Sequence, residues 1–189
     1  QKPPHHFLVI RQILAAEIRA FRLRGGNLPE SGTIVERDEW GIIWATTPDG
    51  AGYPVGGPLE SADAIAHYRP PDPDDPARLV GLREAVRRFK GKRAIVFLTH
   101  DGFEWPHYLR GGMENLFEDW IEEPVRALEV AAMATNWKIR LMQAAIREGA
   151  DAVVSGDDYA AGSGPMMSPA HFRTFVLPYL KQSVKAAHD

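Results

Sequence analysis

The stretch Ala94–Thr99 reads AIVFLT, and this run decides the fold class. It is continuously apolar and rich in β-branched and aromatic side chains, which is typical of a strand buried on both faces of a sheet. A second short run, Asp151–Ser155 (DAVVS), has the same character. Strands of this kind occur mainly in parallel sheets that helices cover. The two runs therefore predict an α/β protein with a parallel sheet.

Helices are predicted around both strands. Asp75 is suited to cap a helix whose first residue is Pro76 and whose last is Phe89. The segment 124–148 carries an apolar residue at every third or fourth position, which predicts one long helix ended by Gly149. Further helices are predicted over residues 5–24, 104–110, 113–122 and 168–187.

The remaining segments are short or broken. Residues 27–60 are punctuated by Gly, Pro and Asp, and they predict a hairpin-like insertion with extended pieces near Thr33–Val35, Trp40–Ala45 and Tyr53–Val55. Arg69–Pro76 holds four of the 15 prolines and predicts a rigid connector. The strands are too few to close a (β/α)8 barrel, which takes about 250 residues. We expect one domain, residues 1–189, that forms a middle portion of such a barrel.

Composition excludes several classes of function. The chain has 189 residues, and its 22 Lys and Arg against 25 Asp and Glu give a net charge of −3, so no basic excess is available for nucleic acid. It has no cysteine, which removes disulfides, thiolate zinc ligands and cysteine nucleophiles within it. No apolar run approaches the roughly 18 residues of a membrane span. We expect a soluble, cytoplasmic protein that binds neither nucleic acid nor membrane.

Two loops are candidate sites, because parallel sheets bind ligands at the carboxyl ends of their strands. The first follows Thr99, and the second follows Ser155. Their chemistry-bearing residues are His100, Asp101, Phe103, Trp105 and Tyr108 in the first, and Asp157, Asp158 and Tyr159 in the second.

Each candidate has an alternative interpretation. His100 and Asp101 could form a proton-transfer site, or Asp101 could simply cap a turn. Asp157 and Asp158 could bind a cation, orient an NH-bearing ligand or work as acid and base, but neighbouring side chains diverge, so one of them should instead cap the following glycine turn. Tyr108 could donate a hydrogen bond to a developing anion or pack beneath a loop.

The sequence gives no sign of a metal or phosphate site. The histidines form no i, i+4 pair, and the glycines up to Gly164 lack the lysine of a phosphate-binding loop. We therefore assign no metal ligand and no cofactor within this chain.

Two segments resemble the uroporphyrinogen decarboxylase superfamily. In the segment 149–187, a Gly-Ala-Asp strand leads into an acidic loop, a Gly-Pro pair and a helix with the pattern Phe-x-x-Phe-x-x-Pro-Tyr, here Phe172, Phe175, Pro178 and Tyr179. In the segment 97–112, a strand and a glycine-containing loop precede a turn similar to the family's Tyr-x-x-x-Gly-Gly, here the residues from Tyr108 to Gly112. The residues from Trp40 to Leu59 are similar to the methyltransferase-like and uncharacterised branches.

This resemblance implies a (β/α)8 barrel with its active site at the strand carboxyl ends. It places Tyr108 at the position of the tyrosine that decarboxylases of the superfamily use on a tetrapyrrole, without metal or organic cofactor. The decarboxylases' aspartate has no counterpart here, which favours the methyltransferase-like branch. In corrinoid-linked methyltransferases, zinc is held by His and Cys on later strands that would follow Asp189.

Our first hypothesis is therefore corrinoid- and zinc-linked methyl transfer to a thiol. Tetrapyrrole decarboxylation is the alternative, and a non-catalytic barrel fragment or binding module is the third. We predict a small-molecule substrate, either a tetrapyrrole or a methylated corrinoid, and a homodimer. The predicted catalytic residues are His100, Tyr108, Asp157 and Asp158, and the predicted substrate-binding residues are Asp101, Phe103, Trp105 and Tyr159.

Overall fold

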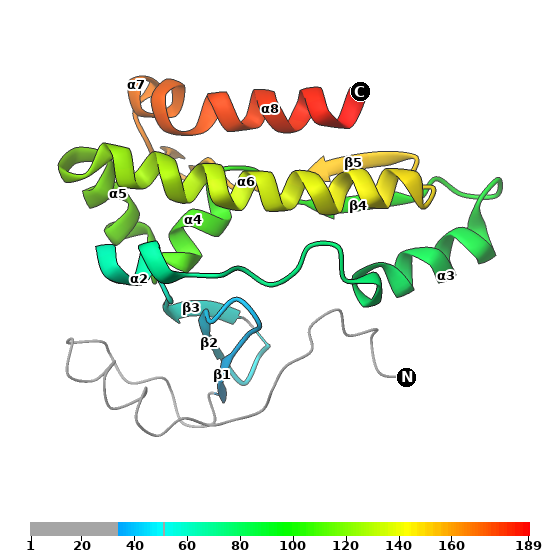
Figure 1. Cartoon of the computed structure of the whole chain (residues 1–189), viewed down its shortest axis with the longest axis horizontal. Helices are drawn as coiled ribbons and strands as arrows, with labels where there is room; N and C mark the ends of the chain where they lie inside the picture. Colours follow the sequence, from blue (N-terminus) through cyan, green and yellow to red (C-terminus); the bar gives the residue numbers. More distant parts are fainter. Residues whose placement is uncertain (1–33, 51) are drawn as a thin grey trace. The chain divides into compact units, whose positions relative to one another are not determined.

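The computed structural model describes residues 34–50 and 52–189 (Figure 1). The helix predicted over residues 5–24 lies outside the described residues. These residues form a mixed α/β structure that groups into two units. One unit comprises residues 72–106 and 118–189, and the other comprises residues 34–71 and 107–117. The prediction of a single domain stays a prediction.

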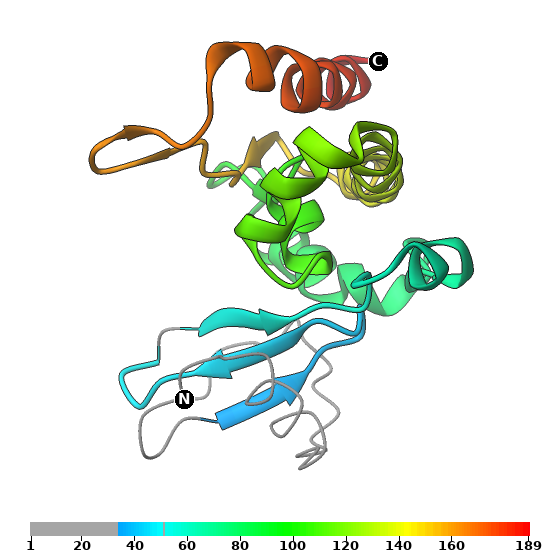
Figure 2. The ribbon, with the colours of Figure 1, turned by 90° about the vertical axis from the view of Figure 1, so that its left-hand side faces the viewer.

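A three-stranded antiparallel sheet forms the second unit's β structure (Figure 2). Its strands are β1 (Ile34–Arg37), β2 (Ile43–Thr46) and β3 (Gly52–Gly56), in that order. The register pairs Ile34 with Thr46 and Tyr53 with Ala45. The predicted hairpin-like insertion is thus confirmed, and each of its three predicted extended pieces overlaps one of these strands. The helix α2 (Ala62–His67), capped by Ser61, follows the sheet and was not predicted.

Two parallel strands form the sheet of the first unit. These are β4 (Val96–Thr99) and β5 (Ala152–Ser155), paired in register from Val96 with Ala152 to Thr99 with Ser155. The parallel pairing of the two apolar runs is confirmed. Three helices lie between the strands in sequence: α4 (Glu104–Leu109), α5 (Met113–Glu122) and α6 (Pro124–Arg147).

The prediction that both strands are buried on both faces is wrong in one respect. One face of the pair is exposed: Val96 retains 55% of its accessible surface, Leu98 64% and Val154 48%. The alternate residues Ile95 and Thr99 are buried. Apolar runs alone cannot show whether a second layer covers each face, because burial depends on the elements that pack there.

The bounds of the helices before and between the strands agree closely with those predicted from the sequence. Asp75 caps a 3-10 turn, Pro76–Leu79, by accepting a hydrogen bond from Ala77 N at 2.8 Å, and α3 (Val80–Phe89) continues it. The long helix α6 ends where Gly149 adopts a φ of +110°. Buried side chains of α6 provide much of the core: Ala127, Val130, Ala131, Ala134, Thr135, Trp137, Lys138, Met142 and Ala145.

The C-terminal segment contains two features that the sequence did not predict. The glycine-rich loop forms a small antiparallel hairpin of β6 (Ala160–Ala161) and β7 (Gly164–Pro165), which extends from the ribbon in Figure 2. The final helix begins as α7 (Pro169–His171), continues as a π-helical segment, η2 (Phe172–Val176), and ends as α8 (Leu177–His188). Within this unit α8 runs beside α6, and Gln182 donates a hydrogen bond to Asn136 at 2.9 Å (Figures 1 and 2).

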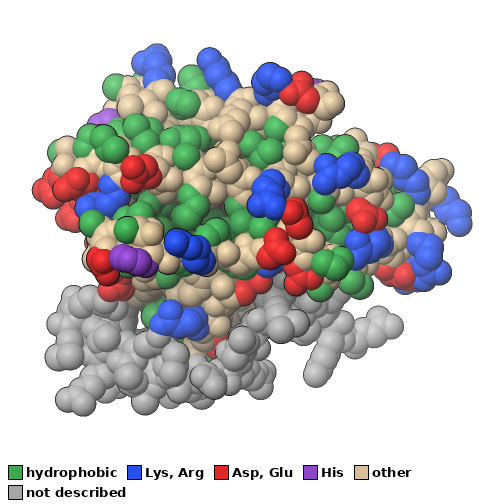
Figure 3. Space-filling model, viewed as in Figure 1, with side chains coloured by type: hydrophobic (Ala, Val, Ile, Leu, Met, Phe, Trp, Pro, Cys, Tyr) green, Lys and Arg blue, Asp and Glu red, His purple; other side chains and the backbone are tan. Residues whose placement is uncertain are grey.

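Surface charge shows no segregation on the face drawn in Figure 3. Lysine and arginine side chains of the described residues are interspersed there with aspartate and glutamate. Among the described residues, no helix combines the length and apolarity that crossing a membrane requires.

Candidate active site

The two candidate loops meet at the carboxyl ends of β4 and β5. Thr99 and Ser155 are register partners at the last position of each strand, and Gly156 N donates to Thr99 O at 2.9 Å. Parallel pairing brings these ends to the same edge of the sheet. The residues that follow, 100–104 and 156–159, therefore lie within hydrogen-bonding distance of one another.

The carboxylate of Asp157 is the centre of this arrangement. Its side chain is fully buried. Its oxygens accept hydrogen bonds from His100 Nδ1 at 3.0 Å and from three backbone N–H groups, those of Asp101 at 3.1 Å, Phe103 at 3.1 Å and Glu104 at 3.2 Å. Burial alone would raise the pKa of Asp157, but the hydrogen bonds from His100, Asp101 and the backbone outweigh it and lower the pKa. Asp157 is thus held as an anion at the first turn of α4.

Asp101 is a second buried carboxyl beside it, with no exposed surface. Its Oδ2 accepts hydrogen bonds from the Tyr159 hydroxyl and, at 3.3 Å, from Ser155 Oγ. No described residue donates to its Oδ1. Burial first, and the neighbouring Asp157 second, raise the pKa of Asp101 to about 8, while the Tyr159 hydrogen bond acts in the opposite direction.

Because the pKa of Asp101 is raised and that of Asp157 is lowered, the pair carries one labile proton, which can be exchanged near neutral pH. When Asp101 is protonated, its carboxyl can donate a hydrogen bond to the neighbouring Asp157 carboxylate. Two carboxyls that share a proton can act as acid and base near neutral pH. Tyr159 remains a donor in this range, because burial and its hydrogen bond to Asp101 raise the pKa of its hydroxyl.

His100 completes the polar part of the site. Its side chain retains 23% exposure, and its ring centroid lies 5.2 Å from that of Trp105. The hydrogen bond to Asp157 fixes the ring orientation and favours a proton on Nδ1. The neighbours His100 and Asp101 thus both adjoin Asp157, one through its side chain and the other through its backbone N–H and its carboxyl.

Asp158 has a different position from Asp157. It is exposed, and its backbone N–H donates to Glu104 Oε1 at 3.1 Å. Because neighbouring side chains on an extended backbone point in opposite directions, only one of the two acids turns inward. The inward acid, Asp157, caps the start of α4. That the outward acid, Asp158, caps the glycine turn stays a prediction.

The predicted aromatic contacts are buried packing positions. Phe103 has no exposed surface, and its ring lies 6.2 Å from Trp120 and 6.0 Å from Tyr159. Trp105 is 8% exposed, and the Lys138 ammonium lies 3.2 Å from its ring centroid. This is a close cation–π contact. Roles for Phe103 and Trp105 in substrate binding stay predictions.

Tyr108 belongs to the unit that contains the antiparallel sheet. There its ring lies edge-on to Trp44, with 5.0 Å between centroids, and 4.2 Å from His107. Its predicted catalytic role stays a prediction.

Sequence reasoning missed two residues that shape the site. Ser155 donates to Asp101, and Glu104 anchors the loop after β5 by accepting from Asp158 N. Ser155 ends its strand, so its position beside the next loop could have been anticipated. Glu104 gave no comparable signal, since its contact joins residues 54 apart in sequence.

No group of three or more metal-ligating side chains is present among the described residues. The carboxylate of Asp157 is occupied by four donors, and cysteine is absent from the chain. These residues do not fit a zinc centre, and the groups they offer for chemistry are proton carriers.

The fold and site define a class: an α/β protein with a buried acid pair at the carboxyl ends of adjacent parallel strands, where such proteins bind ligands. The chain belongs to the uroporphyrinogen decarboxylase (URO-D) family, whose model matches residues 35–189. The resemblance expected from the sequence is confirmed.

A solved structure has a similar fold. It is a methyltransferase from Methanosarcina mazei, with a TM-score of 0.61 and 18% sequence identity. The match covers 80% of this chain and 45% of the methyltransferase, so the chain spans less than half the length of that structure. No curated protein matches the sequence significantly.

Proposed function

We propose that this chain is a portion of a (β/α)8 barrel enzyme that transfers a methyl group from a methylated corrinoid to a thiol. Membership of the URO-D family and the fold shared with a methyltransferase support this assignment. The observation that carries it is the buried acid pair Asp101 and Asp157 at the strand ends, which supplies a group able to accept a proton near neutral pH.

A group of this kind assists methyl transfer to a thiol. The sulfur attacks as the thiolate, so the S–H proton must leave before or during attack. A sulfur–carbon bond then forms, the cobalt–carbon bond breaks, and its electron pair stays on the cobalt. The proton goes to Asp101 in its anionic form, whose pKa near 8 is close to that of a free thiol, about 8.5.

The neighbouring side chains orient the Asp101 carboxyl and stabilise its protonated form. Tyr159 and Ser155 orient its Oδ2 by donating to it, which leaves Oδ1 to receive the proton. Asp157 then accepts a hydrogen bond from the protonated carboxyl. Because Asp157 is fixed by four donors, it does not move as Asp101 titrates.

The test is methyl transfer in the intact protein that contains this chain. With methylcobalamin and a thiol as substrates, we expect the methyl thioether as product, and Asp101→Asn should lower the rate at least about 100-fold. Asp74→Asn is the matched control, since Asp74 is an exposed acid of the same unit that pairs with Arg140. Absence of any methylated thiol from the wild-type protein would rule out the proposal.

Tetrapyrrole decarboxylation is the second candidate, supported by membership of the URO-D family, with Tyr108 as the tyrosine that the sequence resemblance suggests. In this reaction the bond to the carboxylate carbon breaks, carbon dioxide leaves, and the electron pair on the remaining carbon takes a proton. Protonated Asp101 could provide that proton. Carbon dioxide release from uroporphyrinogen, slowed by Tyr108→Phe, would favour this reaction over methyl transfer.

A further inference from the structure

The C-terminal helical segment contacts the Asp101 loop at its backbone. A Cβ atom placed on Gly102 would lie 2.6 Å from Tyr179 Cβ and 2.9 Å from Tyr179 Cγ. Real Cβ atoms do not approach other carbons so closely, so the chain needs glycine here because Tyr179 packs directly on the backbone beside Asp101. The position of the Tyr179 ring is itself fixed, because its hydroxyl donates a hydrogen bond to Leu128 O on α6 at 2.7 Å.

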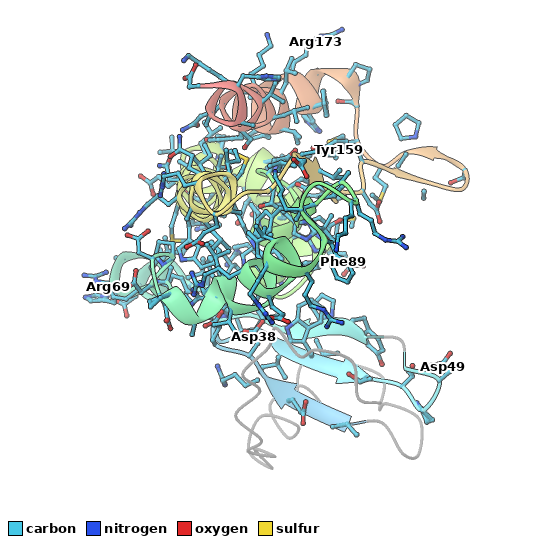
Figure 4. All side chains as sticks on the ribbon, turned by 90° about the vertical axis from the view of Figure 1, so that its right-hand side faces the viewer. Asp38, Asp49, Arg69, Phe89, Tyr159 and Arg173 are labelled. Atoms are coloured by element: carbon cyan, nitrogen blue, oxygen red, sulfur yellow. The ribbon has the colours of Figure 1, made fainter. Side chains whose placement is uncertain are left out.

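The same segment reaches Asp101 by a second route. The Phe172 ring meets the Tyr159 ring edge-on, with 5.4 Å between centroids. Tyr159 donates its hydroxyl to Asp101 Oδ2. Phe172 therefore supports the residue that fixes the orientation of the Asp101 carboxyl. Figure 4 labels Tyr159, which lies beneath the segment from α7 to α8 in that view.

The π-helical segment η2 begins at Phe172 and ends before Tyr179. Phe175 within it stacks on Trp120, with 4.9 Å between centroids and 2° between planes, and Trp120 in turn contacts Phe103. A π-helical turn holds an extra residue, and such turns occur often at functional sites. With this turn in place, Phe172, Phe175 and Tyr179 all pack toward the site.

We propose that Tyr179 and Phe172 are positioning residues for Asp101, with Tyr179 acting through the Gly102 backbone and Phe172 acting through Tyr159. The inference rests on the proposed function only for the chemical role of Asp101. The contacts themselves predict how the Asp101 carboxyl titrates, whatever reaction it serves.

The experiment measures the pH midpoint of the Asp101 carboxyl by NMR of protein labelled with ¹³C at aspartate, with Asp101→Asn used to assign the signal. Tyr179→Leu removes the ring from Gly102 and admits water, so the midpoint should fall by about 1 pH unit. Tyr179→Phe keeps the ring and loses only the hydrogen bond to Leu128 O. The midpoint of this variant should therefore lie within a few tenths of a pH unit of the wild-type value.

Phe172→Leu should act in the opposite direction. It withdraws support from Tyr159, which weakens a hydrogen bond that lowers the pKa of Asp101, so the midpoint should rise. In a Tyr159→Phe background the donor is already gone, and Phe172→Leu should then have almost no further effect. This lack of additivity is the expected sign of two residues that act through one hydrogen bond.

Gln182→Ala is the matched control. It removes the Gln182–Asn136 bond between α8 and α6 without touching Gly102 or Tyr159, so it tests whether loosening the helix is enough. A midpoint shift in this control equal to that of Tyr179→Leu would overturn the proposal. If Tyr179→Leu does not fold, Phe172→Leu decides: an unchanged midpoint in that folded variant also overturns it.

The readout separates this inference from the proposed function. A shifted midpoint in a protein that fails to methylate a thiol would support the positioning role and remove the methyltransferase assignment. An unshifted midpoint in a protein that does methylate a thiol would support the methyltransferase assignment and remove the positioning role.

Discussion

Two aspartates that each follow a strand organise the backbone around them, but they do so over very different sequence separations. Asp38 follows β1 and accepts from Trp40 N at 2.9 Å, Ile42 N at 3.0 Å and Trp44 Nε1 at 2.8 Å, all within six residues. Asp157 follows β5, and its donors lie 53 to 57 residues away. Asp38 shapes a local turn, whereas Asp157 joins the ends of two strands.

The difference teaches where chemistry can arise. The turn at Asp38 forms from its own sequence, and burial there raises the pKa of a single carboxyl. The network at Asp157 forms only when the parallel sheet is complete, and it brings a second carboxyl, Asp101, into contact with the first. Only the long-range network yields two acids whose pKa values move apart, which is the condition for acid–base work.

The largest loss of stability that this comparison predicts follows the removal of the Asp157 anion. Asp157→Asn replaces one acceptor oxygen by an NH2 group, so two of the four buried donors lose their acceptor. At roughly 2 kcal/mol for each unsatisfied donor, the free energy of unfolding should fall by about 4 kcal/mol. Urea unfolding followed by circular dichroism measures it. A fall of less than about 1 kcal/mol would mean that the network is not held by these hydrogen bonds.

The second prediction concerns the pH dependence of stability. Because the pKa of folded Asp101 is raised to about 8, the folded state binds a proton that the unfolded state has lost between pH 4 and 8. Stability should therefore decline as pH rises through this window and level off above it.

Asp101→Asn should remove that decline. An amide can donate to Asp157 and accept from Tyr159 as the protonated acid does, but it cannot ionise. Because one pKa unit corresponds to about 1.4 kcal/mol, the variant should be more stable than wild type by roughly 5 kcal/mol at pH 9, with little difference at pH 4. Parallel stability curves for the two proteins would contradict the assignment of the labile proton to Asp101.

The local turn should respond less. Asp38→Asn keeps one acceptor oxygen and the same shape, so the expected loss is about 1 kcal/mol. Its effect should be confined to the antiparallel sheet, which hydrogen exchange of the β1 and β2 amides can report. A loss as large as that of Asp157→Asn would erase the contrast between local and long-range networks.

The sequence was sufficient for most of the fold around the parallel strands. The cap at Asp75, the helix end at Gly149 and the parallel pairing of two apolar runs all follow from local residue preferences, and all are present. The π-helical segment 172–176 and the exposed face at Leu98 were not foreseeable. Both depend on what packs against an element rather than on its own sequence.

The candidate site was only partly predictable, for the same reason. The rule that ligands bind at strand carboxyl ends selected both loops, and it placed His100, Asp101 and Asp157 among the candidates. It could not show that Asp157 would bind the backbone of the other loop, or that Tyr159 would donate to Asp101. Those contacts depend on register, which a single sequence does not specify for strands so far apart.

The smallest effect tests the finest detail of the long-range network. Tyr159→Phe removes the hydroxyl that donates to Asp101 Oδ2 and keeps the ring against Phe103 and Phe172. A hydrogen bond to the anionic form favours ionisation, so its loss should raise the pKa of Asp101 by about half a unit above its wild-type value. The pH midpoint of stability loss would move up by the same amount. Asp101→Asn/Tyr159→Phe should show no such movement, because the group that titrates is gone, and a shift that persists in the double variant would place the labile proton on another residue.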